Sequence, residues 1–212
     1  MRDTDTPLVW TSPEGDIAKP TDPDVASDLF RVWSYKAIYV RKNPFKLTEK
    51  SAQAVAQYDP FVDMPSLRCI PPSMPNAILS PYPFEFSEEG DDIRLSIEEW
   101  GSERLIDMTS SQIPQDAPRS RLGYSIGRFE NGSLHVHTER LINGLLDDDG
   151  SLMSQDATLD EVFTIAQDGI TLNYKVTVTD PEYLVEPATW IAAWQWNPDT
   201  IMRPYECEFD AQ

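Results

Sequence analysis

The two histidines of this chain, His135 and His137, stand two positions apart in the segment RLGYSIGRFENGSLHVHTERL (121–141). The Asn-Gly dipeptide inside this segment suits a two-residue hairpin turn, so the pattern predicts two paired strands. Alternate residues of a strand face the same side, which places both imidazoles on one face of the hairpin with Tyr124 and Glu139. This face is where chemistry is first expected.

His137 is the candidate for general acid/base catalysis, because imidazole titrates near neutral pH without help from its neighbours. Tyr124 or Glu139 would assist it. A metal site is the alternative, with His135, His137 and carboxylates such as Glu139 or Glu98 as ligands. A polar outer face of the protein, without chemistry, accounts for the same residues.

The orientation of the hairpin decides between these interpretations. Gly123, Ser125 and Gly127 are too small to fill an interior but suit close packing beneath another segment, which turns the histidine face inward. The apolar residues on the same side, such as Phe129, favour the opposite orientation. The acid/base hypothesis requires the ring of His137 to point inward.

A second hairpin is predicted around an Asp-Gly dipeptide further along the chain. In this register Glu161 shares an otherwise apolar stripe with Phe163 and Tyr174. Burial of a carboxyl group among apolar side chains raises its pKa, as in many catalytic acids. The alternative is a structural ion pair of Glu161 with Arg104 or Arg128.

Aromatic residues form a third candidate group. They would line a pocket for a flat apolar ligand, and the residues concerned are Trp100, Phe163, Tyr174, Trp190 and Trp194. Ordinary packing of the same rings in a protein core is the default alternative.

Short β patterns position these residues. Besides the hairpin over residues 121–141, strands are expected over residues 30–40, 84–87, 93–99, 159–167, 170–179 and 188–196. A turn at Gly101-Ser102 would pair Glu99 with Arg104. Residues 47–57 carry a Thr cap and alanines, which predicts one short helix. Strands connected by hairpins must hide their edges, and closure into a barrel does so.

Two segments lack such patterns. Residues 58–83 contain many prolines and are expected to form an extended strap over the barrel, because proline blocks both ladder pairing and helix. Residues 1–28 are rich in Asp, Pro and Thr, and we expect a surface arm. The chain thus divides into this arm and one barrel domain over residues 29–212.

Composition excludes several classes of function. The chain has 212 residues and a net charge of −19, which makes nucleic acid and anionic membranes unfavourable partners. No apolar signal core opens the sequence, so we expect a cytoplasmic protein or an exported one whose leader has been removed. Phosphate loops, dinucleotide fingerprints and CxxC motifs are missing, and no cofactor is expected.

Several motifs together resemble an uncharacterised family of bacterial proteins, many of them exported. The motifs are CIPPSMP from Cys69, PYPFEF from Pro81, GYSIGRFENGSL from Gly123, Asp180-Pro181 and YECE from Tyr205. The resemblance implies a disulfide between Cys69 and Cys207 and lends little mechanism. Family members carry Gly where this chain has Ser73, and an acid where it has His137.

We therefore predict a mainly β fold, a single antiparallel up-and-down barrel of lipocalin-like shape. The hypothesis for function is a cofactor-independent lyase or isomerase that acts on a small hydrophobic or aromatic molecule inside the barrel. A homodimer is compatible with this hypothesis. His137 would be base or acid, Tyr124 and Arg104 would orient an oxygen, and Glu161 would be an acid. The alternatives are a non-catalytic binding protein and a metal-dependent enzyme that uses His135 and His137.

Overall fold

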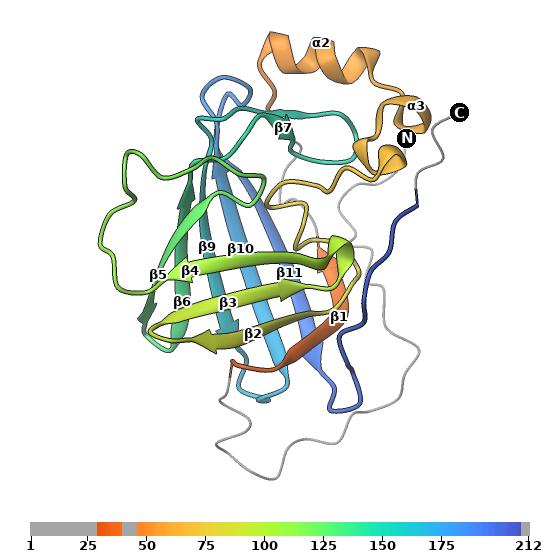
Figure 1. Cartoon of the computed structure of the whole chain (residues 1–212). Coiled ribbons are helices and arrows are strands. Elements are labelled where there is room, and N and C mark those ends of the chain that lie inside the picture. Colours follow the sequence, from red (N-terminus) through yellow and green to blue (C-terminus); the bar gives the residue numbers. More distant parts are fainter. Residues whose placement is uncertain (1–28, 40–45, 209–212) are drawn as a thin grey trace.

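The protein is built around a closed β-barrel (Figure 1). The structure, a computed structural model, describes residues 29–39 and 46–208. Strands follow one another around the barrel in the order β1-β11-β10-β9-β6-β5-β4-β3-β2. The predicted barrel is confirmed, and the predicted arm over residues 1–28 lies outside the described residues.

Most predicted strands exist with small changes at their ends. The barrel strands are β1 (Val32–Tyr39), β2 (Phe84–Glu89), β3 (Asp92–Ile97), β4 (Ser102–Asp107), β5 (Tyr124–Glu130), β6 (Ser133–Glu139), β9 (Thr158–Ile165), β10 (Thr171–Thr179) and β11 (Ala188–Trp196). Two short strands, β7 (Gly144–Leu145) and β8 (Leu152–Met153), pair with each other outside the barrel.

Both predicted hairpin registers are confirmed. In β5–β6, Tyr124 lies opposite Glu139 and Ile126 opposite His137. The other hairpin, β9–β10, places Glu161 opposite its predicted partner, Val176. Turn dipeptides with positive φ and alternation of apolar residues were sufficient to set these registers.

The prediction for β3–β4 was wrong by several residues. Glu99 does not pair with Arg104, because the chain forms a 3-10 turn, η2 (Glu99–Gly101), before β4 begins. Trp100 has a φ of 64° in this turn, so the connection is longer than two residues. Arg104 lies opposite Leu95 instead. This register turns the side chain of Arg104 into the barrel, where it is 2% exposed.

One strand pair departs from the expected antiparallel pattern. β4 and β5 run parallel and pair only through Ile106 with Ser125 and Asp107 with Ile126. The connecting residues 108–123 return the chain toward the other end of the barrel, so that β5 runs in the same direction as β4. The two strands are therefore hydrogen-bonded at one end only, and the stretch over which they separate is named the seam.

Aromatic side chains pack the barrel interior instead of lining an open hollow. Phe84, Phe86, Phe163, Tyr174 and Trp194 are at most 1% exposed and contact one another with ring centroids 4.7–5.6 Å apart. Edge-to-face and tilted pairs of this kind stabilise a close-packed core. The expected ligand cavity among these rings is therefore occupied by the rings themselves.

A cap of helices and loops covers one end of the barrel (Figure 1). It contains the predicted helix, α2 (Glu49–Gln57), whose N-cap Thr48 accepts a hydrogen bond from the backbone of Ser51. Two further turns, α3 (Pro60–Asp63) and η1 (Pro65–Arg68), interrupt the segment expected to be extended. Proline fits the first turn of a helix, which explains this departure. No described helix has the length and apolar character to cross a membrane.

The segment after η1 runs along the barrel as a proline-rich strap. A disulfide between Cys69 and Cys207 joins the start of this strap to the C-terminal segment. Tyr205 of that segment contacts Tyr82 and Trp100, with ring centroids 5.6 and 5.0 Å away. Strap and C-terminal segment therefore fasten each other to the outside of the barrel.

Candidate functional site

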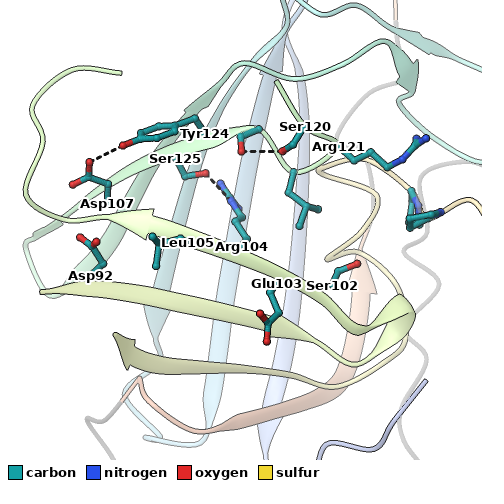
Figure 2. A pocket seen from close by; sticks show the side chains of 14 residues that line it. Asp92, Ser102, Glu103, Arg104, Leu105, Asp107, Ser120, Arg121, Tyr124 and Ser125 are labelled. Carbon is teal, nitrogen blue, oxygen red and sulfur yellow. Dashed lines mark hydrogen bonds between the residues drawn. The ribbon is translucent and has the colours of Figure 1, made fainter. Parts of the chain in front are cut away.

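A pocket of about 430 Å³ opens at the seam between β4 and β5 (Figure 2). Its walls come from three parts of the chain: the strap, β3–β4, and the end of the crossing segment with the start of β5. The lining residues are Pro71, Pro72, Asp92, Ser102, Glu103, Arg104, Leu105, Asp107, Ser120, Arg121, Leu122, Gly123, Tyr124 and Ser125.

Gly123 shapes one wall of the pocket. Its φ is +73°, and a Cβ there would lie 2.5 Å from Thr138 Cγ2 and 2.6 Å from the carbonyl oxygen of Glu139. Only glycine fits this conformation and this spacing. The tight turn lets the chain enter β5 while Arg121 stays on the pocket wall.

Arg104 forms the floor of the pocket. Its Nε donates to Ser125 Oγ at 2.8 Å, its Nη1 to Glu161 Oε1 at 3.0 Å, and its Nη2 to Glu161 and Thr138. Tyr174 donates its hydroxyl to Glu161 Oε1 at 2.9 Å. Every part of this guanidinium is committed to neighbouring groups, which makes it a fixed structural element of the floor.

The pair settles which arginine is the partner of Glu161. The side chains of Arg104 and Glu161 are 1% and 0% exposed, whereas Arg128 pairs with Glu130 on the surface. Burial raises the pKa of Tyr174 well above its usual value, with the Glu161 carboxylate adding to the shift. The Tyr174 phenol therefore stays protonated and donates to the buried carboxylate.

One end of the pocket is acidic. Tyr124 donates its hydroxyl to Asp107 Oδ2 at 2.9 Å (Figure 2). Hydrogen bonds from Ser110 and then Thr109 hold the pKa of Asp107 well below its usual range, so this carboxylate is charged. The hydrogen bond to Asp107 also raises the pKa of Tyr124. Asp92 accepts from the backbone N–H of the neighbouring Met108 at 2.9 Å.

The two carboxylates at this end oppose each other across β3 and β4. Ile93 pairs with Ile106, so the register extended by one residue places Asp92 opposite Asp107. Within the described chain, neither aspartate has an ion pair with lysine or arginine. Like charges placed opposite each other are destabilising, and a positive charge between them would relieve this repulsion.

The other end of the pocket carries Arg121. Its carbonyl oxygen accepts from the backbone N–H of Met74 at 3.1 Å, which fixes the main chain against the strap. Its guanidinium forms no hydrogen bond or ion pair with the part of the chain that the structure describes. Figure 2 places this side chain on the opposite side of the site from Tyr124 and Asp107. The pocket is therefore polarised, negative at one end and positive at the other.

His137 does not have the inward orientation that the acid/base hypothesis requires. Its ring lies on the outer face of β6, 33% exposed, with Nδ1 2.8 Å from Asp160 and Nε2 3.2 Å from Glu139. The small residues of β5 face inward because β4 needs their space: a Cβ on Gly127 would lie 2.6 Å from Ile106 Cγ2 and from Met108 Sδ. Close packing against another segment was expected, and that segment is the end of the neighbouring wall strand β4 with Met108, not the strap.

The environment of His137 still affects its titration. Burial lowers the pKa of His137, but hydrogen bonds to Asp160 and Glu139 outweigh this and raise it above its ordinary value. His135 also lies on the outer face of β6, opposite Arg128. The described residues contain no group of three or more His, Cys, Asp or Glu side chains arranged to hold a metal ion.

The structure brings together only part of the predicted site. Tyr124 and Arg104 line the pocket, and Glu161 lies beneath it as the partner of Arg104. His137 is not among the lining residues. The predicted aromatic ligand residues lie elsewhere: Phe163, Tyr174, Trp190 and Trp194 belong to the core, and Trp100 contacts Tyr205.

Sequence reasoning missed Asp92, Asp107 and Arg121. Asp92 and Asp107 stand at the ends of predicted strands and turns, where charged residues are usually solvated. Asp92 meets Asp107 through the β3–β4 register, which differs from the predicted one. Arg121 comes near them only because β5 starts beside β4 in a parallel pair, for which the sequence carries no local signal. Comparison of the chain with models of protein families, with curated proteins and with solved structures finds no match.

Proposed function

We propose that this protein is a small-molecule-binding barrel whose ligand occupies the seam pocket between β4 and β5. The observation that carries the proposal is the pocket itself, whose volume of about 430 Å³ lies within the range of ligand sites. The interior, in contrast, is filled by aromatic side chains. The proposed binding site therefore lies in the barrel wall, whereas the sequence suggested a site in the barrel interior.

The lining suits a ligand with an apolar body. Pro71 and Pro72 form the wall on the strap, and Leu105 and Leu122 contribute aliphatic surface. Leu105 is 50% exposed, so its side chain is accessible to a ligand. These walls support the hydrophobic or aromatic ligand that the sequence suggested.

The titrating groups of the pocket favour binding over acid/base catalysis. A general acid or base works best with a pKa near the working pH. The pKa of Asp107 is held far below neutral and that of Tyr124 is raised above its usual value. Arg104 is paired and permanently charged. His137, whose pKa is raised above its ordinary value, belongs to a different surface.

The test uses 4-methylbenzyl alcohol, a neutral probe with a flat apolar body. Ser102→Trp places an indole in the pocket, and Ser87→Trp is the matched control on the outer face of β2. Ligand-observed NMR on the wild type should show saturable binding, at least tenfold weaker in Ser102→Trp and unchanged in Ser87→Trp. Equal affinity in all three proteins would refute the pocket as the ligand site.

A further inference from the structure

We infer that the ligand of the seam pocket is a small zwitterion, with a cationic amine held by Asp92 and Asp107 and a carboxylate held by Arg121 at the opposite end. This inference rests on the proposed binding function and adds the chemical class of the ligand. An apolar body would join the two charges and lie along Leu105 and Leu122.

The acidic end is built for a cation. Asp92 and Asp107 face each other across two neighbouring strands and share no lysine or arginine from the described residues. Arg94, the nearest cation on β3, is committed to Glu89 and Glu103. An ammonium group placed between the two aspartates would convert a repulsive pair into two charge-assisted hydrogen bonds.

The basic end is built for a carboxylate. The fork of N–H donors on an arginine matches the two oxygens of a carboxylate. In the described chain, Arg94, Arg104, Arg119 and Arg128 all direct these donors at carboxylates. Arg68 and Arg140 donate to backbone carbonyl oxygens instead. Arg121 has neither kind of partner for its guanidinium within the described residues. Its guanidinium is therefore available to a ligand.

The charge of the whole protein favours a ligand with both charges. At a net charge of −19, the surrounding field repels a purely anionic molecule as it approaches Arg121. A purely cationic molecule would satisfy the aspartates but leave Arg121 without a partner. A zwitterion satisfies both ends and has no net charge.

Three probes that share the same benzene ring separate the contributions of the positive and the negative charge to the affinity. They are 4-(aminomethyl)benzoate, which carries both charges, 4-methylbenzylamine, which carries only the positive charge, and 4-methylbenzoate, which carries only the negative charge. Calorimetric titration should give at least tenfold tighter binding for the zwitterion than for either singly charged probe, because each singly charged probe lacks one charge-assisted contact.

Charge-removing variants locate the two ends. Arg121→Gln should weaken the zwitterion and 4-methylbenzoate about tenfold and leave 4-methylbenzylamine unchanged or slightly tighter. Asp92→Asn keeps the acceptor for the Met108 N–H. It should weaken the zwitterion and 4-methylbenzylamine about tenfold and leave 4-methylbenzoate unchanged or slightly tighter. Arg128→Gln and Glu88→Gln change the net charge equally but lie outside the pocket lining, and they should leave all affinities unchanged.

The outcomes distinguish the inference from the function on which it rests. The inference would be overturned if the zwitterion bound no better than the singly charged probes, or if pocket and control variants changed the affinities equally. The pocket would still be a ligand site in either case if the neutral alcohol binds there. Failure of all four probes to bind would overturn both.

Discussion

The guanidinium of Arg104 meets the carboxylate of Glu161 in the barrel interior, with Nη1 3.0 Å from Oε1 and both side chains nearly inaccessible to solvent. The pair joins β4 to β9 across the interior, beneath the stretch where β4 and β5 separate. The same guanidinium also donates hydrogen bonds to Ser125 on β5 and to Thr138 on β6. This network fixes the floor of the pocket where strand pairing does not.

Arg104→Met should lower the free energy of unfolding by about 3–5 kcal/mol, because it leaves the Glu161 carboxylate buried without its cation. Urea unfolding followed by fluorescence measures the change. Arg128→Met removes an exposed arginine paired with Glu130 and is the control, with an expected loss below about 1 kcal/mol.

Removal of both charges should cost less than the two single changes together. Arg104→Met combined with Glu161→Leu replaces an ion pair by apolar side chains, which is often nearly neutral for stability. We expect the double variant to recover more than about 1 kcal/mol relative to the sum of the single variants. Strictly additive losses would show that the two residues do not act as a pair.

The sequence was sufficient to predict the pairing of strands within hairpins, but it was not sufficient to predict which residues line the pocket. The β5–β6 and β9–β10 hairpins follow from Asn131-Gly132, Asp168-Gly169 and the alternation of their strands, and their registers were confirmed. Turn chemistry acts over a few residues and can be read directly. The partner of Glu161 was narrowed to two arginines, and only the fold decides between them.

The errors share one physical origin, which is packing between distant segments. Whether the histidine face points inward depends on the space that Ile106 and Met108 need beside Gly127, and no pattern within β5 reveals this. The η2 turn shifted the partner of Arg104 because Trp100 adopts a positive φ, which is uncommon for a large residue. Arg121 was overlooked because its significance depends on the seam between β4 and β5.

The outer-face histidine predicts a pH dependence of stability. The folded-state pKa of His137 is raised, so its ion pairs contribute fully below the unfolded value of about 6.5 and are lost as the pH rises through the folded value. His137→Gln should therefore lower stability at about pH 5.5, by less than about 1 kcal/mol after solvent screening, and have almost no effect at about pH 9.

Urea unfolding of wild type and variant at both pH values measures this difference. His135→Gln is the control, since His135 lies on the same face of the same strand. A larger loss for His137→Gln at the higher pH would contradict the direction of the shift.

The disulfide predicts a contribution to stability. Cys69 and Cys207 are 138 residues apart in sequence, so the bond restricts most of the unfolded chain. Replacement of both cysteines by serine should lower the free energy of unfolding by about 2–5 kcal/mol. Calorimetry in the presence and absence of a reductant checks this, because the reductant should destabilise the wild type and leave the double variant unchanged. An equal response of both proteins would contradict the assignment.

The most direct measurement for the seam pocket is a titration of isotope-labelled protein with 4-methylbenzyl alcohol, followed through backbone amide chemical shifts. Saturable shifts should be concentrated at residues 102–107 and 120–125, with smaller changes at the aromatic core. Shifts confined to the outer face around His137, or spread through the core around Trp194, would contradict a ligand site between β4 and β5.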